Sequence, residues 1–255
     1  MLQKTRKYQF LFEELVKRDF KKKYKRTVLG MFWSVLSPLL MLLVMSLVFT
    51  QFFGRSTPHY TIYLFSGQLV FSYFTDATNS GMSSLMDNST IFSKINVPKY
   101  MFLLSKNVSS FINFCLTLVV FLLFVAIDGI PFRWTFLLLL YPIGCLVVFN
   151  IGMGLILSAL YMVFKDVKYL YTVVTQVIMY FSAIFYNIEA FSLHIRYLFY
   201  LNPIFVYIRY FRKIVIVNDI PEPSFHLLCA FYALVVLLIG AFIYKKYNYK
   251  FLYYV

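Results

Sequence analysis

Six cations within nine residues are the densest group of chemically useful side chains in this sequence. They are Arg18, Lys21, Lys22, Lys23, Lys25 and Arg26, and they directly precede the first long apolar run. Cations at a membrane surface attract anionic headgroups, and they suit an anionic lipid-linked substrate in the same way. Arg26 is the strongest single candidate for phosphate, because a guanidinium binds two phosphate oxygens at once. The alternative is that the cluster only anchors and orients the chain.

The sequence lacks the motifs with which a chain performs chemistry on its own. It has no Gly-Lys dipeptide and therefore no P-loop, and the HExxH, GxSxG and EF-hand patterns are absent. The three histidines are far apart, and the three cysteines lie in or beside apolar runs without CxxC spacing. We therefore expect no catalytic residue, no bound cofactor and no metal in this chain. Any ATP and Mg²⁺ would bind to a separate subunit.

Long apolar helices must carry these residues. Apolar residues make up 61% of the chain and charged residues 13%, against roughly 45–50% and 25% in soluble proteins. A bilayer core about 30 Å thick requires about 20 helical residues, and five runs reach that length while a sixth is shorter. The runs are 28–53, 60–80, 100–127, 134–164, 169–186 and 225–244. The predicted fold is an all-α integral membrane protein with six transmembrane helices, since a helix satisfies its own backbone groups in lipid.

The positive charge is distributed unevenly about these runs. Of the 24 Lys and Arg residues, eighteen lie inside if both termini are cytoplasmic, and six lie outside. This bias follows the positive-inside rule and predicts both ends in the cytoplasm. Nucleic-acid binding is the other interpretation of a net charge of +14. We exclude it because the charge follows the membrane topology.

The first 27 residues form a separate unit, in which apolar residues lie on one face of a helix and charged residues on the other. The apolar face contains Tyr8, Leu11, Phe12, Leu15 and Val16. This pattern is typical of an amphipathic helix in the membrane interface. The predicted units are a cytoplasmic N-terminal segment (1–27), a six-helix transmembrane domain (28–244) and a cytoplasmic tail (245–255).

The connection between the second and third runs is polar at first and ends at a proline. Residues 91–97 are predicted to form a short helix that stops before Pro98. Such a helix is the smallest device by which a soluble partner can push on a membrane domain, although it can also simply pack against its own helices. The residues concerned are Ile91, Phe92, Ser93, Lys94, Ile95, Asn96, Val97 and Pro98.

The region between the fifth and sixth runs is too charged for lipid. Its last fourteen residues, 204–217, contain three cations, which suits a re-entrant or interfacial helix better than a span. The cations are Arg209, Arg212 and Lys213. Asn202-Pro203 supplies a break before this segment. We predict two short re-entrant helices within 190–217; the alternative is an external amphipathic loop on the membrane surface.

The opening of the sequence resembles that of the type-2 ABC exporter permeases, specifically those that export lipid-linked O-antigen, capsular polysaccharide and teichoic acid. Members of that family begin with a basic Arg-Asp segment, a Leu-Gly step into the membrane, and then Trp and Asn-Pro. The matching residues are Arg18-Asp19, Leu29-Gly30, Trp33 and Ser37-Pro38, with serine in place of asparagine.

Further motifs are similar to the same family in chain order. Lys165-Asp166 resembles its Arg-Asp element, with lysine in place of arginine. The match to its Asn-Pro re-entrant segment consists of Asn202, Pro203, Tyr207, Phe211 and Arg212. The fifth run lacks the proline of the family's Pro-Ile-Tyr pattern.

The resemblance implies a permease domain at 28–244, in the cytoplasmic (inner) membrane of a bacterium. Two copies of the chain would pair, and two separate P-loop ATPase subunits would dock on the cytoplasmic face. Residues 91–98, Lys165 and Asp166 would receive the motion of the ATPase. The cluster at 18–26 would lie at the substrate entrance. The outer gate would contain Asn202, Pro203, Tyr207, Arg209, Phe211 and Arg212.

The expected substrate is a lipid-linked glycan, and the expected partners are a second copy, the two ATPases and membrane lipids. One alternative is a related permease for a drug or a lipid, but only six residues, 54–59, separate the first two runs, where such proteins commonly carry a large outer domain. A membrane-embedded enzyme that modifies glycans or lipids is a further alternative. It would need clustered acidic residues, whereas the ten here are scattered.

Overall fold

The computed structural model describes residues 2–25, 27–53, 58–95, 97–249 and 251. All regular secondary structure within these residues is helical, so the predicted all-α class is confirmed. The elements are α1 (Leu2–Tyr24), η1 (Gly30–Phe32), α2 (Trp33–Phe53), α3 (Tyr60–Asp87), α4 (Ser89–Phe92), α5 (Tyr100–Ile127), η2 (Trp134–Leu139), α6 (Leu140–Val163), α7 (Val167–Phe181), η3 (Ile188–Ala190), α8 (Leu193–Phe199), α9 (Pro203–Arg212), η4 (Lys213–Val217) and α10 (Pro223–Tyr247).

Four of the described helical segments are long and apolar enough to cross a membrane. They are Trp33–Thr50, Tyr100–Ile127, Trp134–Val163 and Pro223–Tyr247. Because several such helices occur in one chain, the chain is a multi-pass membrane protein. The remaining two predicted spans correspond to α3, which is 28 residues long but carries polar side chains along its length, and to α7, which has only 15 residues. Six spans therefore stay a prediction.

The core forms where α3, α5, α6 and α10 pack against one another. Glycine allows the closest of these crossings. A Cβ atom on Gly152 of α6 would lie 2.6 Å from the backbone nitrogen of Leu237 in α10, and one on Gly240 would lie 2.5 Å from the carbonyl oxygen of Gly152. The backbones of α6 and α10 thus touch directly, which fixes the position of α10 along α6.

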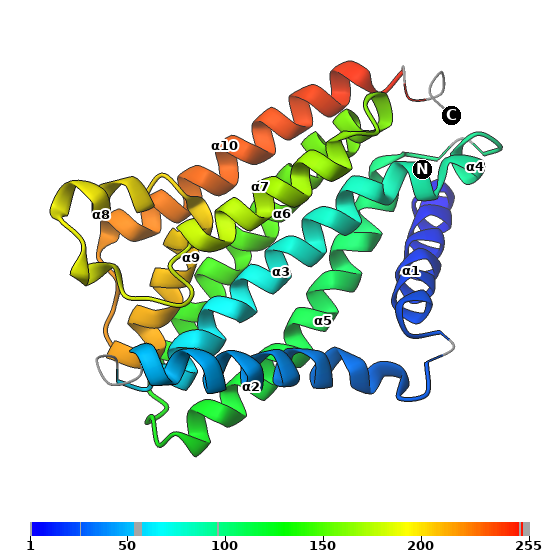
Figure 1. Cartoon of the computed structure of the whole chain (residues 1–255). Coiled ribbons are helices and arrows are strands. Elements are labelled where there is room, and N and C mark those ends of the chain that lie inside the picture. The colour runs from blue at the N-terminus through cyan, green and yellow to red at the C-terminus, as the bar shows by residue number, and fades with distance from the viewer. Residues whose placement is uncertain (1, 26, 54–57, 96, 250, 252–255) are drawn as a thin grey trace.

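The two ends of the bundle differ (Figure 1). α4, the junction of α6 with α7 and the last turn of α10 lie together at one end, here called the α4 end. α8 and α9 lie at the opposite end, here called the α8 end. A hydrogen bond from Lys99 Nζ to the Asn248 carbonyl, 2.7 Å long, joins the start of α5 to the residue after α10 at the α4 end. α1 runs beside α5.

The short helix predicted at 91–97 is displaced in the structure. α4 covers Ser89–Phe92, and turns follow at residues 93–95. The helix begins earlier because the Asn88 carbonyl accepts hydrogen bonds from the backbone of Ile91 and Phe92 at 3.0 and 3.3 Å. Its extension to Val97 is also disfavoured, because a residue that precedes proline avoids the helical region.

Two short helices, α8 and α9, do occupy the region predicted to be re-entrant, and Asn202 separates them as expected. The Asn202 side chain accepts a hydrogen bond from the backbone of Ile204 at 3.0 Å and so caps α9, whose first residue is Pro203. Whether these helices enter the membrane stays a prediction. The fifth predicted run ends early: α7 stops at Phe181, and Ala183 takes a left-handed conformation with φ 48°.

Candidate functional site

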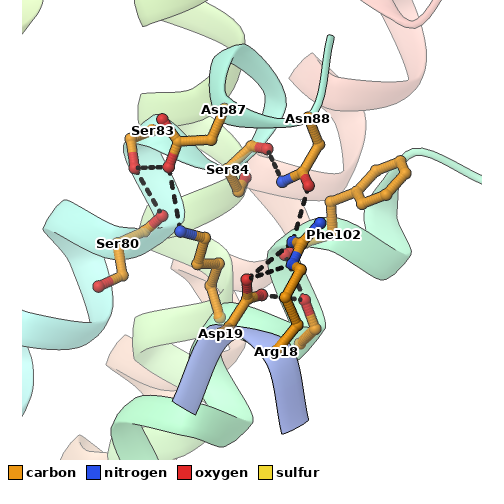
Figure 2. Close-up of polar contacts among 10 residues, drawn as sticks. Arg18, Asp19, Ser80, Ser83, Ser84, Asp87, Asn88 and Phe102 are labelled. Carbon is orange, nitrogen blue, oxygen red and sulfur yellow. Dashed lines mark hydrogen bonds and ion pairs between the residues drawn. The ribbon is translucent and has the colours of Figure 1, made fainter. Parts of the chain in front are cut away.

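A partly buried polar network ties α1 to the rest of the bundle at the α4 end (Figure 2). Arg18 donates to Asp19 Oδ1 from Nε and Nη2, at 3.1 and 2.7 Å, and its Nη2 also donates to Asn88 Oδ1 at 2.8 Å. The second carboxylate oxygen of Asp19 accepts from the Ser105 hydroxyl at 2.9 Å. The Asn88 amide donates in turn to the Ser84 carbonyl at 2.8 Å. Arg18 and Asp19 therefore join α1 to α3 and α5.

A second ion pair lies beside this network (Figure 2). Lys106 of α5 contacts Asp87, the last residue of α3, with Nζ 3.0 Å from Oδ2. The Ser83 hydroxyl donates to the same oxygen at 3.0 Å. The end of α3 is thus tied to α5 through Asp87 and to α1 through Asn88.

The predicted entrance residues divide into three groups. Arg18 contacts Asp19 and Asn88 through Nε and Nη2 while its side chain stays 40% exposed, so its role at the entrance stays a prediction. Lys21, Lys22 and Lys25 are exposed. The Lys23 side chain and the whole of Arg26 lie outside the part of the chain that the structure describes, so the roles of both residues stay predictions.

The predicted coupling residues also separate by burial. Phe92 is only 5% exposed and packs against Phe102, with ring centroids 6.2 Å apart. This is the alternative arrangement, in which the side chain packs against its own helices. Ser93, Lys94 and Ile95 are exposed, and Ile91, Val97 and Pro98 are half-buried. Asn96 lies outside the part of the chain that the structure describes.

The remaining coupling candidates lie at the same end. Lys165 and Asp166 are exposed in the turn between α6 and α7, at the α4 end (Figure 1). Lys99 supports the region from within: its ammonium lies 5.5 Å from the ring centroids of both Phe92 and Phe251. Burial lowers the pKa of Lys99, because the charged form loses hydration. Phe92 and Lys99 thus form a scaffold behind the exposed residues 93–95.

The predicted outer-gate residues lie at the α8 end and are mostly engaged within the chain. The Arg212 guanidinium donates to the carbonyls of Ala183 and Ile184, both at 2.9 Å, and to that of Tyr63 at 3.1 Å. It also lies 3.4 Å from the centroid of the Tyr63 ring. Arg212 therefore holds the unwound chain that follows α7 against α3.

The other members of the outer-gate set lie in α9 or directly before it. Tyr207 and Phe211 are fully buried, and the Tyr207 hydroxyl donates to the Cys229 carbonyl in α10 at 3.0 Å. Arg209 stacks on the rings of Tyr200 and Phe225, at 5.2 and 5.7 Å. Asn202 also donates to the Phe181 carbonyl at 3.0 Å. Through these contacts α9 and Asn202 are attached to the end of α7, to the residue after α8 and to α10.

A cavity of about 740 Å³ lies between α2, α3 and α5, and the sequence analysis did not predict it. Its lining combines aromatic and polar side chains, among them Trp33, Gln68, Ser72, Tyr73, Asn113 and Phe114. A pattern in the sequence could have indicated this cavity, because polar residues recur at helical spacing on α3 and α5. They are Gln68, Ser72 and Asp76 on α3, and Ser110, Asn113 and Thr117 on α5. Such a lining can bind a molecule that has both hydroxyl groups and apolar faces.

Known proteins resemble the chain, two of the following three along nearly its whole length. The O-antigen export system permease protein RfbA of Klebsiella pneumoniae is 25% identical over 247 residues, which cover 95% of each chain. RfbA of Myxococcus xanthus is 28% identical over 166 residues, 64% of this chain and 63% of its own. The polysialic acid transport protein KpsM of Escherichia coli is 23% identical over 238 residues, 91% of this chain and 92% of its own.

The family model of the ABC-2 type transporters matches residues 11–216. This range begins within α1 and ends within η4. It therefore contains the network around Arg18 and also the Arg212 cluster, which consists of Arg212 with Tyr63, Ala183 and Ile184. The chain belongs to the ABC-2 type transporter family.

Proposed function

We propose that this chain is the permease subunit of an ATP-driven exporter that carries lipid-linked polysaccharide across the cytoplasmic membrane of a bacterium. One observation carries the proposal: relatives named for O-antigen export and for polysialic acid transport align with the chain over 95% and 91% of its length. The chain is a transport subunit rather than an enzyme. ATP and Mg²⁺ bind on a separate ATPase, since the sequence has no P-loop.

In this arrangement the six spans are α2, α3, α5, η2 together with α6, α7 and α10. Both termini and the α4 end face the cytoplasm, and α8 and α9 approach the membrane from outside. The distribution of lysine supports this orientation, because Lys94, Lys99, Lys165, Lys245 and Lys246 all gather near the α4 end. α1 lies at the cytoplasmic boundary as an interfacial helix. Two copies of the chain form the channel, with two ATPase subunits beneath it.

The ATPase contacts the exposed residues of the α4 end. A soluble partner would meet cationic, apolar and acidic groups here. They belong to Lys94 and Ile95 after α4, and to Lys165 and Asp166 between α6 and α7. Phe92, buried behind them, transmits a push on residues 93–95 to Phe102 in α5. At the opposite end, the Arg212 cluster forms the base of the outer gate.

The cavity between α2, α3 and α5 supports a glycan as cargo. Sugar rings present CH faces that stack on aromatic rings, while their hydroxyls bond to polar side chains. Trp33, Tyr73 and Phe114 supply the rings, and Gln68, Ser72 and Asn113 supply polar groups. The mixture of rings and hydrogen-bonding groups suits a sugar, which has both kinds of surface.

Deletion of the gene tests the proposal. Cells without the chain should lose their surface polysaccharide and accumulate the lipid-linked glycan inside, as measured by surface labelling and by extraction of polyprenyl-linked sugars. Restoring the gene should reverse both effects only if the partner ATPase has an intact P-loop lysine. Normal surface polysaccharide in the deletion strain, without any internal accumulation, would contradict the proposal.

A further inference from the structure

The chain that follows α10 is packed into the core at the α4 end. α10 ends at Tyr247, yet Phe251 beyond it is fully buried. The ring of Phe251 meets that of Tyr244 in α10 edge to face, with centroids 5.3 Å apart. A segment beyond the last helix of a domain is usually poorly ordered unless something holds it. The burial of Phe251 therefore requires contacts outside α10.

Lys99, the residue before α5, supplies such a contact. Its ammonium donates to the Asn248 carbonyl at 2.7 Å and lies 5.5 Å from the centroid of the Phe251 ring. It lies equally far from the ring of Phe92 in α4. A lysine cation is attracted to the faces of aromatic rings, so one side chain joins α4 and α5 to the chain after α10. Lys99, Asn248 and Phe251 are here called the Lys99 clamp.

The clamp borders a small apolar core that reaches the end of α6. The buried members of this core are Leu15, Leu85, Phe92, Phe102, Leu103, Leu155, Ala159, Met162, Tyr244 and Phe251. Met162 belongs to the last turn of α6, directly before the turn that contains Lys165 and Asp166. α6 and α10 also touch through their backbones, as the contact of Gly152 with Gly240 shows. The clamp therefore attaches α4 to the pair formed by α6 and α10.

The two proposed contacts for the ATPase belong to these separate elements. Residues 93–95 follow α4, whereas residues 165–166 follow α6. α4 has only four residues, and so short a helix has little stability of its own. A push on residues 93–95 would displace α4 alone unless α4 were fixed to a larger part of the molecule.

We propose that the Lys99 clamp makes the two contact segments, 93–95 and 165–166, move as one body, with Lys99 as the positioning residue. The inference rests on the proposed function, because it takes these segments as the contacts of the ATPase. A motion received at residues 93–95 passes through Phe92 and Lys99 to the chain after α10. It reaches α6 through the direct contact between α6 and α10.

Lys99 can be changed without removing much of the packing. Burial lowers the pKa of Lys99, because its charged form loses hydration. A methionine would occupy about the same space without that cost in free energy. Lys99→Met should therefore break the clamp while leaving the midpoint of thermal unfolding of the purified protein nearly unchanged.

Hydrogen exchange of the full-length permease in nanodiscs tests whether the clamp holds α4, since exchange reports local opening. Lys99→Met should accelerate exchange about tenfold in residues 89–95 and 244–249, as expected from losing one charge-assisted hydrogen bond and the attraction to two rings. Phe251→Ala opens the clamp from its other side and should accelerate exchange in residues 89–95 as well. Lys99→Arg keeps a cation and a donor, so exchange should stay slow.

Lys246→Met is the matched control, because it removes an exposed lysine from the last turn of α10. It should leave exchange in residues 89–95 and 244–249 unchanged. Residues 182–186, at the α8 end, should exchange equally in all of these variants.

Addition of the ATPase tests whether the clamp joins the two contact segments. In the unmodified protein the ATPase should slow exchange in residues 89–95 and in residues 163–169 together. In Lys99→Met it should still slow exchange in residues 163–169 but no longer in residues 89–95. A role in stability alone would not separate the two segments in this way. Lys99→Arg should restore the joint response.

Two results would overturn the proposal. One is unchanged exchange in residues 89–95 of both Lys99→Met and Phe251→Ala, since the clamp would then not hold α4. The other is faster exchange in these variants combined with full protection of both segments by the ATPase, since the clamp would then only support the fold.

The deletion experiment separates the clamp from glycan export, because none of the exchange measurements uses the glycan. The expected exchange pattern, together with normal surface polysaccharide in the deletion strain, would uphold the clamp and reject glycan export. Unchanged exchange in the variants, together with lost surface polysaccharide, would reject the clamp alone. If the ATPase protected neither segment of the unmodified protein, the proposed ATPase contact and the role of the clamp would both be overturned.

Discussion

Arg18 donates a hydrogen bond to Asn88 at 2.8 Å, although 70 positions separate the two residues in the sequence. Asn88 is the residue between α3 and α4, and its carbonyl begins α4. The N-terminal helix is therefore attached to the same residue that positions the proposed contact surface for the ATPase. A displacement of α4 would move α1 through Arg18, and α5 through Asp19 and Ser105.

Substitution of Arg18 tests this attachment. Arg18→Lys keeps the charge but replaces the two donating nitrogens, Nε and Nη2, with one ammonium on a shorter side chain, so we expect it to lose at least one of the three contacts with Asp19 and Asn88. Losing one or two such hydrogen bonds costs about 1–2 kcal/mol. We expect a fall of several degrees in the midpoint of thermal unfolding of the purified transporter, and faster proteolysis within α1. Lys21→Gln, at an exposed neighbour, is the matched control; equal midpoints for both variants would contradict the structural role of Arg18.

Two positions near α4 should respond in opposite ways. Phe92 is buried against Phe102, so Phe92→Ala should destabilise the permease by about 3–5 kcal/mol and reduce the yield of folded protein. Ile95 is 47% exposed, so Ile95→Asp should leave folding intact and weaken association with the ATPase, since apolar anchors dominate small interfaces. Size-exclusion chromatography of each variant with the ATPase measures both effects. Full yield for Phe92→Ala would show that this ring does not support the α4 end.

The sequence predicted helices well and contacts between distant residues poorly. Residues 100–127 form one helix with the predicted bounds, because a long apolar run has few other options in lipid. The helix predicted at 91–97 lies earlier, because the Asn88 carbonyl begins it and Pro98 disfavours its extension to Val97. A sequence shows the charge of Arg18 but not its partners, so the contacts of Arg18 could not be predicted, and its role at the substrate entrance stays a prediction. Arg18 contacts Asn88, and the adjacent Asp19 contacts Ser105. Asn88 and Ser105 become neighbours only when α3 and α5 pack together.

Cysteine labelling tests the proposed topology. In a variant whose three native cysteines are replaced by alanine, Tyr197→Cys in α8 and Tyr249→Cys after α10 provide accessible probes, since these side chains are 70% and 83% exposed. An impermeant maleimide applied to intact cells, or to spheroplasts where an outer membrane is present, should label position 197 but not position 249. Both should react after lysis. Labelling at position 249 before lysis would reverse the orientation.

Arg212 offers the sharpest test at the α8 end, because its guanidinium binds carbonyls from two separate segments. Arg212→Lys would retain the charge but lose most of the contacts with Tyr63, Ala183 and Ile184, so we expect a loss of stability of about 2 kcal/mol or more. Gly67→Ala reaches the same cluster from α3, since the new Cβ atom would lie 2.9 Å from Arg212 Nη2 and 3.2 Å from Ile184 Cγ2. The two variants should therefore resemble each other.

Both variants should loosen the chain between α7 and α8 rather than the α4 end. Hydrogen exchange of the purified transporter should accelerate at residues 182–186 in each, while exchange in residues 84–92 stays unchanged. Arg209→Lys is the matched control, because a lysine can keep a cation over the rings of Tyr200 and Phe225. The double variant Gly67→Ala/Arg212→Lys should be less destabilised than the sum of the single variants, since both disturb one contact. Simple additivity would mean that Gly67 does not provide space for Arg212.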